Sequence, residues 1–204
     1  MKETNFEKRE ELLQAALDEF SVKKYEEASL NNIIKKAKIS KGTFYYHFKD
    51  KQDLYLYLLE SSVKTKWEYI DSHLKELAGV SKNDIFENFK LQARLGAEFA
   101  AVYPKYHNLS KMLTKEKGNE IYDIIKCKLS GDSVTVNPLK SMIEDAVDNG
   151  NFRDGIPKEF IFKIISFMFT NFDEVFYAEK DLDINNIIKN LDYYVDFIKN
   201  GLGK

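Results

Sequence analysis

The chain has 204 residues, 44% of them hydrophobic and 31% charged, so it has enough apolar side chains for a packed core and is not intrinsically disordered. Its 31 basic and 33 acidic residues nearly cancel, so a surface that binds nucleic acid would need basic side chains gathered locally. The single cysteine, Cys127, excludes an internal disulfide. The first residues are charged where a signal peptide is apolar, and the charge-free run over residues 164–172 is too short for a membrane helix, so we expect a cytoplasmic protein without a membrane segment.

Helices are expected along the whole chain. The sequence has three prolines and nine glycines, and its apolar residues recur at spacings of three and four, which predicts an all-α protein of about nine helices. The first helix is expected over residues 6–22. Its apolar stripe consists of Leu13, Ala16, Leu17 and Phe20.

Three residues are predicted to cap the next helices: Ser29, Ser40 and Asp50. Each has a side-chain oxygen that can accept a hydrogen bond from a free amide in the first turn. The first of these helices is expected to end by Lys38 and the second at Phe48, whereas the third is long. We therefore expect a small helical domain over residues 1–50 and a larger helical domain over residues 51–204.

The segment 29–54 has the spacing of a helix-turn-helix. Two short helices are separated by the turn Lys38–Ser40, in which Ile39 is expected to fill the angle between them. Phe44 and Phe48, four residues apart, are predicted to face the core. The opposite face of the second helix carries mostly polar residues: Lys41, Gly42, Thr43, Tyr45 and Tyr46.

Charge is segregated at this segment. Residues 28–51 contain six lysines and one acid, a balance of +5, whereas residues 1–27 have a balance of −3. Because duplex DNA is a polyanion, this local excess favours an interaction with DNA in a protein whose net charge is −2.

The same segment resembles the TetR family of bacterial transcriptional regulators. The matching positions are Ser29, Ile33, Ala37, Ile39, Ser40, Gly42, Thr43, Phe44, Tyr45, Tyr46, His47, Phe48, Lys51 and Leu54. Two residues depart from the family pattern: Ile34 replaces a small alanine, and Lys38 stands where the family often has glycine. If Lys38 is left-handed, its conformation costs about 1 kcal/mol.

The resemblance implies which residues contact DNA. Those near the bases would be Lys41, Gly42, Thr43 and Tyr45, with Asn31 as a further candidate, and those on the phosphate backbone would be Ser29, Tyr46, His47 and Lys51. Two alternatives remain at this point. One of the two tyrosines could pack inward, and His47, beside the core residue Phe48, could have a structural role.

The larger domain is expected to bring two copies of the chain together. Residues 160–176 are apolar on nearly every face, which is more than one surface helix needs, and the last helix has an apolar stripe. Packing these two helices against the same helices of a second, two-fold related copy would give the four-helix dimer interface that the resemblance implies. The expected interface residues are Phe167, Val175, Ile187, Leu191, Val195 and Ile198. The alternative is that the stripe of the last helix packs within one subunit.

The resemblance also implies a small-molecule effector bound in the larger domain. Its pocket could be lined by Trp67, Phe99, Tyr103, His107, Met112 and Phe169, with Cys127 and Met142 as weaker candidates, although each of these could be ordinary core. Because this domain is rich in aromatic residues and methionine, we expect a mostly apolar effector that relieves repression.

Catalysis is not expected. The three histidines, His47, His73 and His107, show no metal-ligand spacing, and the sequence has no glycine-rich phosphate loop or nucleophile elbow, so we expect no metal or cofactor. The sequence predicts a homodimeric repressor that binds a palindromic operator. The alternative is a helical ligand-binding or protein-interaction module without sequence-specific DNA binding.

Overall fold

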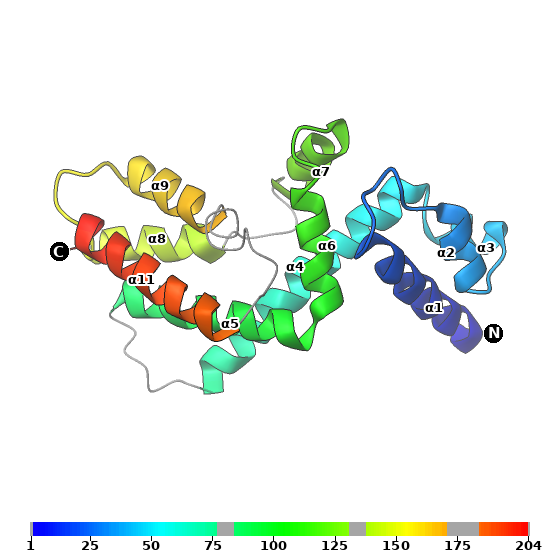
Figure 1. Ribbon diagram of the computed structural model, residues 1–204, viewed down its shortest axis with the longest axis horizontal. Helices are drawn as coiled ribbons and strands as arrows, with labels where there is room; N and C mark the ends of the chain where they lie inside the picture. Colours follow the sequence, from blue (N-terminus) through cyan, green and yellow to red (C-terminus); the bar gives the residue numbers. More distant parts are fainter. Residues whose placement is uncertain (1, 77–83, 131–137, 171–183, 204) are drawn as a thin grey trace. The chain divides into compact units, whose positions relative to one another are not determined.

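The computed structural model describes residues 2–76, 84–130, 138–170 and 184–203, and it confirms the all-α fold (Figure 1). Ten helices lie in these ranges, one more than the sequence predicts for the whole chain. They are α1 (Lys2–Phe20), α2 (Leu30–Lys36), α3 (Lys41–His47), α4 (Lys51–Glu76), α5 (Ile85–Val102), α6 (Pro104–Thr114), α7 (Glu120–Ser130), α8 (Pro138–Asp148), α9 (Lys158–Thr170) and α11 (Ile184–Leu202).

The chain forms two compact units. The first unit consists of residues 1–68 and 99–134, and the second consists of residues 69–98 and 135–204. The first unit therefore contains the whole of the expected DNA-binding domain, 1–50, together with most of α4 and with α6 and α7. Where the DNA-binding part ends stays a prediction.

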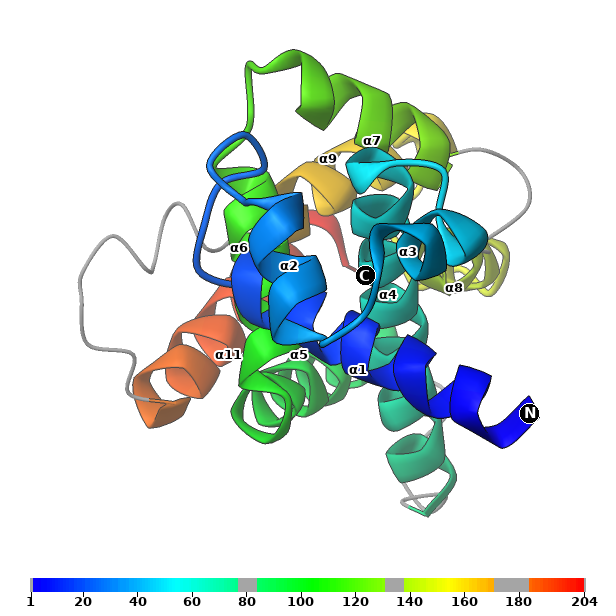
Figure 2. The same ribbon diagram turned by 90° about the vertical axis from the view of Figure 1, so that its right-hand side faces the viewer.

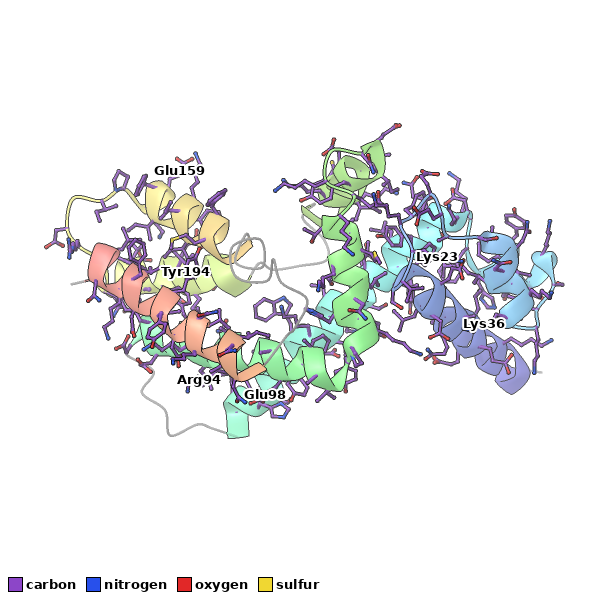
Figure 3. All side chains as sticks on the ribbon, viewed as in Figure 1. Lys23, Lys36, Arg94, Glu98, Glu159 and Tyr194 are labelled. Carbon is purple, nitrogen blue, oxygen red and sulfur yellow. The ribbon has the colours of Figure 1, made fainter. Side chains whose placement is uncertain are left out.

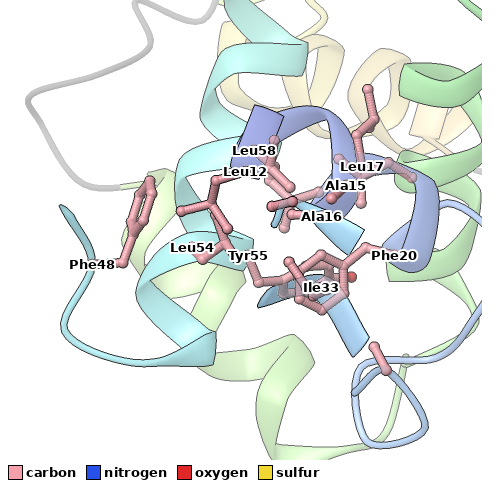
Figure 4. Close-up of a cluster of buried hydrophobic side chains, with 14 of the residues drawn as sticks. Leu12, Ala15, Ala16, Leu17, Phe20, Ile33, Phe48, Leu54, Tyr55 and Leu58 are labelled. Atoms are coloured by element: carbon pink, nitrogen blue, oxygen red, sulfur yellow. The ribbon is translucent and has the colours of Figure 1, made fainter. Parts of the chain in front are cut away.

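The core of the first unit is built from α1, α2, α3, α4, α6 and α7. Its fully buried side chains include Leu12 and Phe20 of α1, Ile33 of α2, Phe44 of α3 and Leu54 of α4, several of which appear in Figure 4. On α1 the buried stripe is shifted from the expected one. Leu12 is 0% exposed, whereas the expected core residue Leu13 is only partly buried.

Each of the three predicted caps forms. Ser29 Oγ accepts from Asn32 N at 3.3 Å and Ser40 Oγ accepts from Thr43 N at 3.0 Å. Asp50 Oδ1 accepts from Asp53 N at 2.8 Å. Because α2 and α3 have only seven residues each, these caps matter more to them than to a long helix.

The core of the second unit lies between the start of α5, α8, α9 and α11. Phe86, Ile143, Ile165 and Val195 are buried in it. After α8 the chain returns to the end of α11, where Phe152 forms an isolated β-bridge with Gly203. A Cβ at Gly203 would lie 2.5 Å from the carbonyl oxygen of Lys199, so this close approach requires glycine.

Three residues of the expected dimer interface are buried within one subunit, and two of them, Val195 and Ile198, belong to this core. Leu191, Val195 and Ile198 are 6%, 0% and 2% exposed within one subunit, so their side chains cannot line a surface that meets a partner. The part of the stripe from Leu191 to Ile198 therefore packs inside the subunit. An apolar stripe marks a buried face, but it does not tell whether the neighbouring helix comes from the same chain or from another. Within the described residues, no helix combines the length and apolar character needed to cross a membrane.

Candidate DNA-binding site

The turn between α2 and α3 has the geometry of a helix-turn-helix, and Figure 2 shows both helices turned toward the viewer. Ala37 ends α2, and Ile39 N donates to Ile34 O at 3.3 Å, so the chain reverses within three residues before Ser40 begins α3. Ile39 is partly buried against the core, as expected. Lys38 has a φ of 52°, the left-handed conformation that the sequence left open.

Helix α3 turns one face inward and the other to solvent. Phe44 and Phe48 are 0% and 5% exposed, whereas Tyr45 and Tyr46 are 59% and 73% exposed. Neither tyrosine packs inward, although the ring of Tyr45 contacts the ring of Phe44 edge-on at a centroid distance of 5.1 Å. Two adjacent aromatic rings in solvent are available to a partner.

The start of α3 is open to close approach. Lys41 and Gly42 are exposed, and a Cβ built on Gly42 would meet only Ser40 Oγ, at 3.6 Å. The fold therefore does not require glycine at this position. Thr43 is half-buried, and its Oγ1 lies 2.9 Å from Ser40 Oγ, which orients the hydroxyl. Asn31 on α2 is exposed.

Three of the four residues expected to contact phosphates, Tyr46, Ser29 and His47, differ in whether their polar atoms are exposed or already hydrogen-bonded. Tyr46 is open to solvent, whereas the hydroxyl of Ser29 already caps α2. His47 is half-buried, and its Nε2 has no hydrogen-bond partner among the residues described. Burial, together with the nearby charge of Arg9, lowers the pKa of His47, which favours the neutral ring.

Lys51, the fourth, is engaged inside the domain. Its Nζ donates to the backbone oxygens of Tyr25 at 2.7 Å and Ala28 at 3.1 Å, and it lies 4.2 Å from the centre of the Tyr25 ring. The ammonium group thus ties the start of α4 to the loop between α1 and α2. One of its three N–H donors remains for a phosphate.

Further lysines lie on α2, in the turn and after α3. From the sequence they have no individual role and contribute only to the local charge balance. Lys35, Lys38 and Lys49 are exposed, and no ion pair to them occurs within the described part of the chain. Lys36, in contrast, pairs with Asp18 at 2.8 Å, and Lys23 pairs with Glu19 at 2.6 Å. Both lysines are labelled in Figure 3. The exposed lysines leave a positive surface on α2 and the turn.

The two acids near the end of α1, Asp18 and Glu19, pair with lysines on other segments. Burial opposes ionisation of Asp18, but hydrogen bonds from Lys105 of α6 and Lys36 of α2 outweigh it and lower its pKa to about 2. Glu19 accepts from Lys23 and from the backbone N–H of Ser29, and these contacts lower its pKa as well. The charges of these two carboxylates are therefore compensated within the unit.

Residues 12–58 match the family model described as "Bacterial regulatory proteins, tetR family". Through these residues, here called the TetR domain, the chain is similar to the TetR family. It is 29% identical over 134 residues to the HTH-type transcriptional regulator AcrR of Shigella flexneri, a match that covers 64% of this chain and 54% of AcrR. It is 26% identical over 199 residues to the uncharacterized HTH-type transcriptional regulator YvdT of Bacillus subtilis, which covers 96% of this chain and 95% of YvdT.

Solved structures share the fold over nearly the whole chain. A TetR-family regulator from Chloroflexus aurantiacus matches with a TM-score of 0.68 and 21% identity, covering 99% of this chain and 98% of that one. A regulator from Syntrophomonas wolfei matches with a TM-score of 0.69 and 23% identity, covering 97% of each. The chain spans about half the length of some of the curated relatives it matches, AcrR among them.

Five of the residues expected to line an effector pocket belong to the first unit, as the TetR domain does. Trp67 on α4 and His107 and Met112 on α6 are half-buried. Phe99 is 2% exposed, and its ring lies tilted against the ring of Tyr103, with the centroids 4.9 Å apart. The sixth, the side chain of Phe169, lies outside the described residues, and of the weaker candidates Cys127 is exposed.

A cavity of about 660 Å³ lies in the second unit, away from the TetR domain in sequence. Its lining residues are Ile85, Asn88, Met142, Asp145, Ala146, Asp148, Asn149 and Asn151. Met142 is the one member of the expected pocket set among them, and most of the others are polar. The expected effector pocket stays a prediction, because only one of its weaker candidates, Met142, lines this cavity.

The second unit exposes aromatic side chains on two helices. Phe160 and Phe167 of α9 are 53% and 64% exposed, and Tyr193 and Phe197 of α11 are 62% and 70% exposed. Tyr194 Oη donates to Met168 O at 3.0 Å, which holds the two helices together. Of the remaining expected interface residues, Ile187 is half-buried and Val175 lies outside the described residues.

Proposed function

We propose that the protein is a homodimeric DNA-binding transcriptional regulator that represses genes by binding a near-palindromic operator. The observation that supports it most strongly is the two-faced helix α3: Phe44 and Phe48 anchor it in the core while Lys41, Tyr45 and Tyr46 remain in solvent. A helix that enters the major groove needs one face anchored in the core of its domain and an opposite, exposed face with polar side chains. A bacterial repressor of this kind acts in the cytoplasm, where the DNA is.

Base reading is assigned to the start and middle of α3. Lys41 and Tyr45 supply side-chain donors, Gly42 lets the backbone approach the groove, and Thr43 adds a hydroxyl whose orientation is set by Ser40. Asn31 on α2 is a further base-reading candidate.

Phosphate contacts are assigned around these residues. Tyr46 offers a free hydroxyl, and Lys51 offers its remaining N–H. Ser29 and His47 complete the set that the TetR resemblance suggests. We expect their contribution to be smaller, because the Ser29 hydroxyl already caps α2 and the lowered pKa of His47 disfavours its cationic form.

We place the two-fold dimer interface on the exposed aromatic side chains of α9 and α11. Phe160, Phe167, Tyr193 and Phe197 are large apolar or aromatic side chains, and burying them against a second copy would remove from water a surface that a monomer leaves exposed. One recognition helix per subunit then implies two inverted half-sites in the operator.

We propose that a mostly apolar small molecule is the effector that releases the protein from its operator. The support is the aromatic set near α4, α5 and α6, in which the ring of Phe99 contacts that of Tyr103 and Trp67 is half-buried. An effector that binds the DNA-incompetent arrangement about 100-fold more tightly supplies about 2.7 kcal/mol of coupling. By reciprocity, saturating operator must weaken effector binding by the same factor. A ligand whose affinity the operator leaves unchanged is not the inducer.

Footprinting on the DNA upstream of the protein's own gene tests this function. We expect protection that is saturable and confined to a near-palindromic site, and that persists in an excess of unrelated DNA. Equal binding to all DNA, or none, would contradict a regulator. That result would favour a helical ligand-binding or protein-interaction module, in which Lys41, Tyr45 and Tyr46 would have no role.

A further inference from the structure

We infer that Lys38, in the turn between α2 and α3, is a DNA-phosphate contact for which the fold accepts a left-handed backbone. This rests on the proposed function and adds a residue to it. Lys38, with a φ of 52°, is the single non-glycine residue at positive φ in the ranges that the structure describes. Gly118, Gly150 and Gly155 hold the other positive-φ positions. A side chain in this conformation is strained, whereas glycine is not.

Nothing within the described unit requires lysine at this position. The side chain is exposed and has neither a hydrogen bond nor an ion pair to any described residue. The turn itself is held by backbone bonds, from Lys38 N to Lys35 O at 3.2 Å and from Ile39 N to Ile34 O at 3.3 Å. Glycine would make the same bonds. A residue that strains the backbone without contributing to packing points to a role outside the fold.

The surroundings of Lys38 fit a polyanion. It lines a surface groove of about 440 Å³ with Lys35, Lys36 and Glu19. The acid is already compensated, because Glu19 accepts from Lys23 at 2.6 Å and from Ser29 N at 3.1 Å, and Lys36 is neutralised by Asp18. The charges of Lys35 and Lys38 therefore remain uncompensated at the groove, in a surface that a phosphate backbone matches.

The position in the chain favours a phosphate over a base. Lys38 precedes the cap of α3, Ser40, and lies outside the helix whose first residues are assigned to the bases. In a helix-turn-helix the second helix occupies the groove while the preceding segment crosses the backbone. A phosphate contact of this kind fixes the orientation of α3 and carries no sequence information of its own.

Four substitutions separate the charge of Lys38 from its backbone conformation. Lys38→Gln removes the charge and keeps a strained side chain, Lys38→Asn and Lys38→Gly remove the charge and suit a left-handed position, and Lys38→Arg keeps the charge. Lys128→Gln is the matched control, because Lys128 is an exposed lysine on α7 and its replacement changes the net charge equally. The probes are a duplex selected by the wild-type protein from random sequences and an unrelated duplex of the same length.

We expect Lys38→Gln, Lys38→Asn and Lys38→Gly to bind both duplexes about thirtyfold more weakly at about 0.15 M salt, because each dimer loses two phosphate contacts. The slope of log affinity against log salt should fall by about two, with the preferred sequence unchanged. Lys38→Arg and Lys128→Gln should bind as the wild type does. In thermal unfolding, Lys38→Gly and Lys38→Asn should melt at or above the temperature of Lys38→Gln, since they relieve the strain.

An unchanged salt slope in the three neutral variants would overturn the inference, as would a changed base preference. A loss in Lys38→Arg as large as that in Lys38→Gln would overturn it too. Failure of the proposed function looks different: in that case the wild-type protein itself selects no sequence from the random pool. If the wild type selects a sequence and the neutral variants bind it equally well, only the role of Lys38 is wrong.

Discussion

Glu116 and Tyr25 are hydrogen-bonded across 91 positions of sequence: the backbone N–H of Tyr25 donates to Glu116 Oε1 at 2.7 Å. Glu116 is 1% exposed, and its other oxygen accepts from Asn119 Nδ2 at 2.6 Å. The carbonyl of the same Tyr25 accepts from Lys51. The loop before α2 is thus held from both sides, by the turn between α6 and α7 and by the start of α4.

Replacing Glu116 should destabilise the first unit. Glu116→Ala leaves the part-buried N–H of Tyr25 without its acceptor and removes the bond to Asn119, which costs about 1–3 kcal/mol. Glu116→Gln keeps one oxygen acceptor and should cost less. Chemical denaturation measures both, with Glu98→Ala on an exposed site of α5 as the control. Equal stability of Glu116→Ala and Glu98→Ala would show that the buried contact contributes nothing.

Lys51→Ala should lower both stability and DNA affinity. It removes the two bonds to the carbonyls of Tyr25 and Ala28, so the loop that carries the cap of α2 is released, and the melting temperature should fall by several degrees. Binding should weaken on selected and unrelated duplexes alike, because no base contact is lost. A variant that keeps its affinity for unrelated DNA but prefers another sequence would contradict this assignment.

Tyr45 and Tyr46 should have separable effects on DNA binding. Tyr45→Ala should change the preferred base at one position of each half-site, whereas Tyr46→Phe, which removes only the hydroxyl, should weaken binding to every sequence by the same factor. Neither should change the melting temperature much, since both side chains are mostly in solvent. Sequence selection with each variant gives the answer, and the opposite pattern would exchange their roles.

Stability should fall in acid partly through Asp18. Its pKa is about 2 in the folded protein, below its ordinary value of 3.8, so the carboxylate binds protons more readily in the unfolded chain. Its contribution is therefore complete above about pH 4 and is lost as the pH falls toward 2. Asp18→Asn should be less stable than the wild type at neutral pH, and the difference should shrink over that range. A difference that is constant with pH would show that the ion pairs to Lys36 and Lys105 are not its source.

A charge on the exposed face of α11 should separate the subunits. Phe197 is 70% exposed in one subunit, and Phe197→Asp would place a carboxylate in the proposed two-fold interface, where burial without a partner is costly. Sedimentation should show monomers at a concentration at which the wild type is dimeric. Val22→Asp, at another exposed apolar site, is the control and should remain dimeric. An unaffected Phe197→Asp dimer would place the interface elsewhere.

Local features of this fold could be read from the sequence. The three caps, the turn at Lys38–Ser40 and the inward pair Phe44 and Phe48 depend on residues within a few positions of one another, so spacing alone identifies them. The outward placement of Tyr45 and Tyr46 then follows from helical geometry.

Contacts between distant segments could not be read in this way. Glu116 and Tyr25 are far apart in sequence, and only the packed unit shows that Lys51 is occupied by two backbone carbonyls. The periodicity of α11 correctly marks a buried face. It does not say whether the face is covered by the same chain, and for Leu191, Val195 and Ile198 it is.

The most direct test of a sequence-reading dimer is selection of duplexes from a random pool by the wild-type protein, followed by binding to the enriched site and to its isolated half. Two recognition helices should enrich two inverted half-sites on one face of the duplex, and the full site should be bound far more tightly than the half-site. Enrichment of no sequence, or equal affinity for half and full sites, would contradict a dimer that reads DNA through α3.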